Sequence, residues 1–198
     1  MSQELLPGYK IRRGSTLDRA LLVKFMQRTY QETFPQQDFS HLARTVEQYF
    51  SRETPLWWVD FLGVEVEDKG QGGQGARGTR GKEDKAIQNS KLEVSSSSPH
   101  LPISPSPIAC LWVGNAIDQI QGDRHAHIFL LYVAPEHRRQ GIGTALMRYV
   151  EDWARARGDR QIALQVFKTN TAALNLYNQL DYQTQSLWMV KSLDVTEK

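Results

Sequence analysis

One stretch of the chain, from Glu67 to Pro107, is too poor in apolar residues to join a folded core. It holds only seven of them: Ala76, Ala86, Ile87, Leu92, Val94, Leu101 and Ile103. Glycines crowd its first part, a run of serines follows, and prolines crowd its end. Such a composition buries too little apolar surface to offset the entropy cost of ordering the segment. We therefore expect one domain over residues 1–198, interrupted by a disordered insertion at 67–107.

Charge and composition exclude several classes of protein. Lys and Arg number 24 against 22 Asp and Glu, so the net charge of +2 argues against a strongly basic nucleic-acid binder. The longest apolar run, Ile128–Ala134, is far shorter than the roughly 18 residues of a membrane span. The N-terminus shows no secretory signal, and the single cysteine, Cys110, excludes an intrachain disulfide and a cysteine-based zinc site. We expect a cytoplasmic protein with no metal and with neither a nucleic acid nor a membrane as partner.

Helical and strand-like periods alternate along the rest of the chain. Apolar residues recur at helical spacing in four segments: 17–30, 39–50, 142–157 and 171–180. Strand-like patterns occupy six others: 9–13, 57–66, 108–117, 127–133, 162–167 and 182–193, the last as one or two strands. The two strands that flank the insertion indicate a hairpin whose turn has been replaced by it. This order predicts an α/β or α+β sheet with helices on both faces.

A glycine-containing turn joins the predicted central strand to the clearest helix. It reads Arg138-Arg139-Gln140-Gly141-Ile142-Gly143-Thr144. A helix N-terminus offers free N–H groups and a positive dipole end, and glycines let an anion approach the backbone. These features favour a phosphate or pyrophosphate ligand. The Walker loop and the three-glycine dinucleotide fingerprint are both missing, and the glycine spacing alone fits an ordinary basic loop equally well.

Two motifs here resemble those of the GNAT N-acetyltransferases. Arg138-x-x-Gly141-x-Gly143 is similar to the family's coenzyme A pyrophosphate motif, and Asn170-x-x-Ala173-x-x-x-Tyr177 is similar to its second motif. The chain departs from the family at Asp181-Tyr182, where glycine usually precedes the aromatic residue, although aspartate tolerates left-handed backbone. The resemblance covers about 128–182. It implies a mixed, mostly antiparallel GNAT-like sheet with a splayed parallel strand pair.

The resemblance also implies a reaction. Acetyl-CoA would be the cosubstrate, and its acetyl group would pass directly to a primary amine of a small molecule or peptide. The pantetheine arm would lie between 131–133 and 164–166, where an N–H near Val133 would polarise the thioester carbonyl. The implied cofactor-binding residues are Leu131, Tyr132, Val133, Arg138, Arg139, Gln140, Gly141, Ile142, Gly143, Thr144, Asn170, Ala173 and Tyr177. Related enzymes are often dimers, which leaves a homodimer open.

Two residues are the predicted catalytic groups, each with a structural alternative. Tyr177 would protonate the leaving thiolate, or it is an aromatic core residue. His127, on the central strand two residues after His125, would act as general base, or it is structural. Three other residues also have expected roles. Asn170 also fits a helix N-cap, and His137 is expected to face solvent or phosphate. Cys110 fits a buried core residue better than a nucleophile.

The acceptor site and the function itself keep alternatives. Candidates for an aromatic or amine-selecting pocket lie in the turn 31–38 and among the tryptophans: Glu32, Phe34, Trp57, Trp58 and Trp188. Tryptophans on strands are more often core residues. A polyamine-like amine, an amino acid, an antibiotic and a protein terminus all remain open as acceptors. The other functions are a catalytically inactive acyl-CoA-binding or sensing module, and an interaction protein whose insertion docks a partner.

Overall fold

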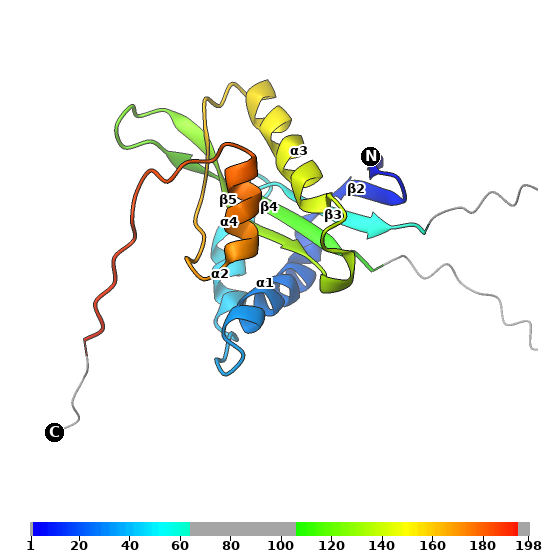
Figure 1. Ribbon diagram of the computed structural model, residues 1–198, viewed down its shortest axis with the longest axis horizontal. Helices are drawn as coiled ribbons and strands as arrows, with labels where there is room; N and C mark the ends of the chain where they lie inside the picture. The colour runs from blue at the N-terminus through cyan, green and yellow to red at the C-terminus, as the bar shows by residue number, and fades with distance from the viewer. Residues whose placement is uncertain (1, 64–105, 194–198) are drawn as a thin grey trace, which may run out of the picture.

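The computed structural model describes residues 2–63 and 106–193 (Figure 1). The expectation of a disordered insertion lies outside the described residues, except for Ser106 and Pro107. A single sheet has the strand order β1-β2-β3-β4-β5-β6, and all neighbours are antiparallel except the parallel pair β5 and β6. The strands are β1 (Ser2–Leu6), β2 (Tyr9–Arg13), β3 (Leu56–Phe61), β4 (Ala109–Ile117), β5 (Arg124–Val133) and β6 (Ile162–Leu164). The predicted mixed, mostly antiparallel sheet is confirmed.

Helices cover both faces of this sheet. The α-helices are α1 (Arg19–Thr33), α2 (Leu42–Tyr49), α3 (Ile142–Ala156) and α4 (Thr171–Gln179), and short 3-10 turns span Thr16–Asp18 and Pro135–His137. Neighbouring strand residues alternate between two buried clusters: Trp57 packs in the cluster with α3 and α4, and Trp58 packs in the cluster with α1 and α2. Ser15 and Asp18 form a capping box at the start of the 3-10 turn that leads into α1.

Strands β3 and β4 flank the residues outside the described range. They pair antiparallel up to Val59 and Ala109, and the Ile108 N–H donates to the Val59 carbonyl (2.7 Å). The predicted hairpin arms are therefore confirmed, and the pairing that holds them together lies within the described strands.

This pairing leads to a stability prediction. Replacing 68–106 with a short glycine-containing turn is expected to leave Tm within about 5 °C of the parent, because loop closure entropy changes slowly with loop length. Thermal unfolding followed by circular dichroism measures it. A large loss of Tm would show that the replaced residues pack on the domain.

A β-bulge in β5 decides which face each half of the strand serves. Val113 pairs with Ile128 and Trp112 with Leu130, so Phe129 is the extra residue. As a result Ile128 belongs to the α3–α4 cluster, whereas Leu130 belongs to the α1–α2 cluster. Strict alternation would have put both on one face.

The parallel pair opens beyond this bulge. Pairing between β5 and β6 runs from Ala126 and Ile162 to Ile128 and Leu164. The strand β6 ends there, whereas β5 continues to Val133. The predicted splay is confirmed, and β6 is shorter than the predicted strand 162–167.

Both ends of the chain differ from the prediction. The unpredicted β1 pairs with β2, and its mixed sequence lacks the alternation that marks a strand. The strands predicted over 182–193 are wrong: no part of this segment is a strand, and it runs away from the sheet (Figure 1). Beyond Tyr182, which packs on the α3–α4 cluster, its apolar side chains are exposed, Trp188 by 79%. Strand propensity takes effect only where a backbone finds a partner to pair with. Within the described ranges, no helix has the length and apolar character needed to cross a bilayer.

Candidate active site

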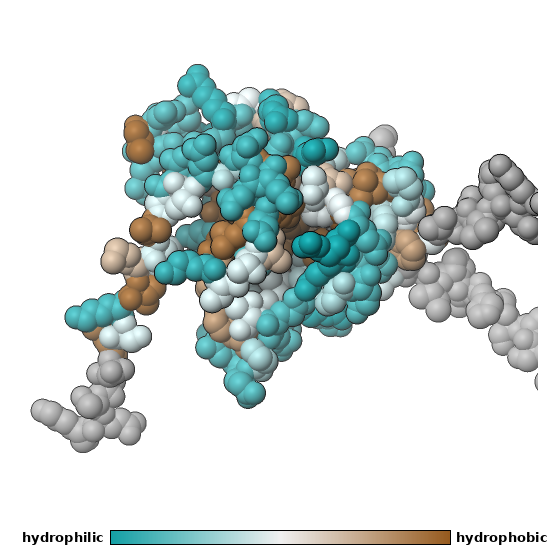
Figure 2. All heavy atoms as spheres, in the orientation of Figure 1, coloured by the Kyte–Doolittle hydropathy of each residue, from teal (hydrophilic) through white to brown (hydrophobic). Residues whose placement is uncertain are grey.

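A cleft of about 1120 Å³ lies where β5 and β6 part. Clefts that hold a drug-sized ligand measure roughly 300–1,000 Å³, so this cleft is large enough for such a ligand. One wall comes from α1 and the residue that follows it, and the other from the turn before α3 and from α4. In Figure 2, hydrophilic residues cover most of the visible face, and apolar atoms show between them where the surface is hollowed.

The structure brings most of the predicted site residues together. All of the predicted cofactor-binding residues line the cleft except Gln140, and so does the predicted acid Tyr177. The side chain of Gln140 instead accepts a hydrogen bond from the hydroxyl of Tyr9 on β2. The predicted base His127 is not among the lining residues.

The turn before α3 presents backbone donors to the cleft. Arg139 (φ 64°) and Gly141 (φ 82°) have left-handed backbone, which turns the chain sharply into the helix. The Ala145 N–H donates to the Gly141 carbonyl (2.9 Å) as the helix begins. The N–H groups of the three residues between them are left without a partner inside the helix. Together with the positive end of the α3 dipole, they form a site for an anion.

Strands β2 and β3 hold this turn in place. The Tyr9 hydroxyl lies 3.1 Å from Nδ1 of His137, and the rings of Tyr9 and His137 each lie 5.0 Å from the Phe61 ring. His137 was expected to face solvent or phosphate. It lines the cleft, but Tyr9 and Phe61 pack against it, so it supports the turn.

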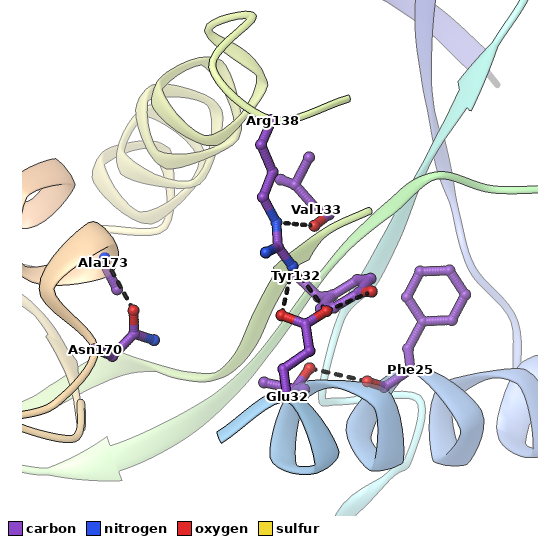
Figure 3. Close-up of polar contacts among 8 residues, drawn as sticks. Phe25, Glu32, Tyr132, Val133, Arg138, Asn170 and Ala173 are labelled. Carbon is purple, nitrogen blue, oxygen red and sulfur yellow. Dashed lines mark hydrogen bonds and ion pairs between the residues drawn. The ribbon is translucent and has the colours of Figure 1, made fainter. Parts of the chain in front are cut away.

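Arg138 connects the turn to α1 (Figure 3). Its Nε donates to the Val133 carbonyl (2.8 Å), and its Nη2 donates to both carboxylate oxygens of Glu32 (2.8 and 2.6 Å). The Tyr132 hydroxyl donates to the same carboxylate (3.0 Å). Burial, and then the contact with Glu32, raise the pKa of Tyr132. The ion pair is about 40% exposed on both sides, so it is worth at most about 1 kcal/mol and can exchange partners easily.

Tyr177 lies on α4, and Asn170 directly precedes this helix, on the opposite wall. Tyr177 is 9% exposed, and burial raises its pKa to about 12, so the phenol keeps its proton at neutral pH. The Oδ1 of Asn170 accepts from the Ala173 N–H (3.1 Å), which confirms the N-cap. After the helix, Asp181 has the left-handed backbone (φ 62°) expected where the family places glycine.

The other candidate residues lie apart from the cleft. His127 is half-buried beside Phe129, and burial, followed by the charge of His125, lowers its pKa. Cys110 is fully buried in the α1–α2 cluster, and burial raises its pKa. The expectation that it is a buried core residue is confirmed. Trp57 and Trp58 are core residues, so of the acceptor candidates only Glu32 and Phe34 line the cleft.

Comparison with known proteins supports the resemblance to one family. Residues 102–182, which hold both motifs, match the sequence model of the Acetyltransferase (GNAT) family. This segment of the chain is similar to the GNAT family. The chain is 37% identical over 60 residues to an uncharacterized N-acetyltransferase, YobR, of Bacillus subtilis. The alignment covers 30% of this chain and 24% of YobR. It is 28% identical over 88 residues to human N-acetyltransferase 8, which covers 38% and 39%. The chain thus spans less than half the length of these relatives.

Solved structures share the fold of this chain. A possible acetyltransferase from Clostridium difficile 630 has a TM-score of 0.60 at 16% identity, covering 94% of this chain and 98% of that one. A predicted acetyltransferase with acetyl-CoA from Clostridium acetobutylicum has a TM-score of 0.60 at 14% identity, covering 93% and 96%. An aminoglycoside acetyltransferase from a soil metagenome, in complex with sisomicin, has a TM-score of 0.57 at 16% identity, covering 96% and 100%. At such identities, the similarity shows the fold alone.

The structure adds residues that the sequence analysis missed. Thr29 and Thr33 of α1 line the cleft beside Glu32, and on the other side Thr169, Thr171 and Asn175 do so. The α1 set had a detectable signal, because positions 29, 32 and 33 share one helix face at spacings of three and four. The residues around α4 had no comparable signal outside the motif.

Proposed function

We propose that this protein transfers an acetyl group from acetyl-CoA to a primary amine by direct attack. The observation that carries the proposal is one cleft in which the unpaired N–H groups at the start of α3 and the buried, protonated phenol of Tyr177 occur together. The first feature suits a pyrophosphate and the second suits a leaving thiolate.

The backbone of β5 supports the position of the donor. The Ala134 N–H donates to Ile108, which extends β4 (2.8 Å). Because N–H groups alternate sides along a strand, those of Leu131 and Val133 point away from β4, toward the side where β6 has ended. The pantetheine arm fits this gap, and the Val133 N–H can polarise the thioester carbonyl. The turn residues Gly141, Ile142, Gly143 and Thr144 would hold the pyrophosphate.

The proposed reaction balances as follows. The neutral amine attacks the thioester carbon, a C–N bond forms, and the C–S bond breaks. The thiolate takes the proton of Tyr177, and the amine releases its own proton, so that the phenol is restored. With its pKa raised to about 12, Tyr177 would protonate unfavourably a thiolate that kept the pKa of about 8.5 it has in water. The site that raises the pKa of Tyr177 by burial also raises that of the thiolate, which narrows this difference.

Removal of the amine proton does not require a base in direct contact. His127 stays a prediction as general base, and from its position outside the cleft it would act through water. Glu32 and the threonines of α1 give the cleft a polar side that water can reach.

A thiol-release assay tests the proposal. The full chain is mixed with acetyl-CoA and a panel of primary amines, and free coenzyme A is measured while calorimetry follows donor binding. The expected result is donor binding together with amine-dependent thiol release. Tight acetyl-CoA binding without release for any amine would contradict the transferase and favour the inactive sensing module.

Arg138→Ala is expected to weaken coenzyme A binding by about 10- to 100-fold. The substitution removes a charge-assisted contact to the pyrophosphate, worth roughly 1.5–3 kcal/mol, and frees the ends of β5 and α1 that Arg138 joins. Calorimetry measures the change in Kd. The matched control is Arg155→Ala, which removes the same charge from the exposed far end of α3. Equal losses in the two variants would reduce the role of Arg138 to general electrostatics.

A further inference from the structure

The α1 wall of the cleft carries one negative charge, and positive charges surround it. Among the described residues that line the cleft, Glu32 is the only carboxylate, whereas Arg138 and Arg139 are both cationic. Arg28 is close enough to lower the pKa of Tyr132 through its charge. Glu32 already shares its charge with Arg138. This part of the cleft can therefore attract one ammonium group, but it repels a molecule with several.

An apolar surface adjoins this carboxylate. The ring of Phe34, two residues after Glu32, meets the ring of Phe167 edge-on, with centroids 5.3 Å apart. Tyr30 packs against both Phe167 (6.2 Å) and Phe39 (5.5 Å). We call these four rings the aromatic corner.

The aromatic corner bridges two segments that are distant in sequence. Tyr30, Phe34 and Phe39 belong to the end of α1 and the turn that follows it. Phe167 follows β6. Phe34 lines the cleft, and Phe167 remains 48% exposed beside it. Half-exposed aromatic rings next to a cleft can bind a flat apolar group by edge-to-face contact and by removal of water.

We propose that the acceptor is a molecule with a single ammonium group that carries an aromatic or bulky apolar substituent. Glu32 would receive the ammonium and the aromatic corner would receive the substituent. This inference rests on the proposed acetyl transfer, whose acceptor it specifies. An arylalkylamine and a peptide that begins with an aromatic residue share this chemistry.

The same surroundings favour the attacking form of the amine. An amine must lose its proton before it can attack the thioester. Apolar rings and the nearby guanidinium of Arg138 both disfavour the charged ammonium, so they lower its pKa toward neutrality. Glu32 opposes this effect only partly, because its charge is shared with Arg138. A polyamine would lose this advantage, since its other charges would need water or further carboxylates.

The first experiment compares acceptors with the full chain and acetyl-CoA. Its panel holds 2-phenylethylamine, ethylamine, spermidine, an aminoglycoside and the peptide Phe-Gly-Gly. We expect kcat/KM for phenylethylamine to exceed that for ethylamine by about tenfold or more, because the phenyl group leaves water. The ratio of kcat/KM for phenylethylamine to that for Phe-Gly-Gly shows whether the acceptor is a small arylalkylamine or a peptide. A preference for spermidine or the aminoglycoside over both would overturn the inference.

The second experiment removes one ring of the aromatic corner. Phe167→Ala is expected to raise KM for phenylethylamine by about tenfold and to leave KM for ethylamine within about twofold. Phe167→Leu, which keeps an apolar side chain, should recover part of the loss. The control is Ile120→Ala, which removes a 94% exposed apolar side chain from the turn between β4 and β5. Equal losses for the two amines in Phe167→Ala would overturn the inference.

A binding measurement separates this inference from the proposed function. If no amine is acetylated although acetyl-CoA binds, the proposed function fails. Phenylethylamine binding with coenzyme A present, followed by calorimetry, then decides the inference alone. Binding that Phe167→Ala weakens by about tenfold supports an aromatic amine site in a protein without turnover. An absence of binding overturns the site as well.

Discussion

Replacing Tyr177 with phenylalanine is expected to lower the rate of acetyl transfer by about 100- to 10,000-fold, the usual contribution of general acid–base catalysis. The ring is kept, so its packing among the α3–α4 cluster and against Tyr182 should survive. Only the hydroxyl proton that the thiolate needs is removed. Single-turnover kinetics with saturating acetyl-CoA measures the chemical step itself, free of product release.

Two controls show whether the loss belongs to chemistry. Calorimetry should give an unchanged Kd for acetyl-CoA, and the thermal unfolding curve should stay within a few degrees of the parent. A thioester with a more acidic thiol should recover part of the lost rate, because a weaker base needs less protonation. Transfer at the parent rate by Tyr177→Phe would show that the phenol is a core residue and that water protonates the thiolate.

Gly143→Asp is expected to weaken coenzyme A binding by more than about 100-fold. The substitution places a carboxylate among the N–H groups at the start of α3, where it occupies the anion site and repels a pyrophosphate. Calorimetry with coenzyme A measures the loss.

The packing of Gly143 requires a neutral control. A Cβ at this position would lie 3.1 Å from Cδ2 of Leu176, the end of a flexible side chain, so a side chain here shifts that leucine side chain slightly. Gly143→Asn has the same size as the aspartate variant without its charge. Affinity should therefore fall much further in Gly143→Asp than in Gly143→Asn. Equal affinities would place the pyrophosphate elsewhere.

Local patterns in the sequence were sufficient for much of the fold. The helix α3 could be predicted because Ile142, Leu146 and Val150 recur at helical spacing and are buried together, and because Gly158 (φ 81°) follows its end. The bulge at Phe129 could not be predicted, because β5 is almost continuously apolar and carries no alternation that a bulge would interrupt. Gly114 was its only trace: a Cβ there would overlap the Phe129 ring.

The candidate site divides in the same way. The two motifs located the cleft, since Gly141, Gly143, Asn170 and Tyr177 all line it. The ion-pair partner of Arg138 could not be predicted, because Glu32 lies 106 residues away in the sequence and contacts it only in the folded chain. The predicted strands over 182–193 failed for a related reason, since apolar composition shows that a segment can pair but not that a partner is present.

Because Cys110 is buried, the native protein contributes almost no signal of its own in a thiol assay. It is the only sulfhydryl in the chain, its side chain is 0% exposed, and its pKa is raised by burial, so almost no reactive thiolate exists in the native state. A colorimetric thiol reagent added to a reaction mixture would therefore report released coenzyme A without a contribution from the enzyme. Without coenzyme A, the same reagent would react only with molecules that have unfolded enough to expose Cys110. The reaction rate would then measure how often the protein unfolds.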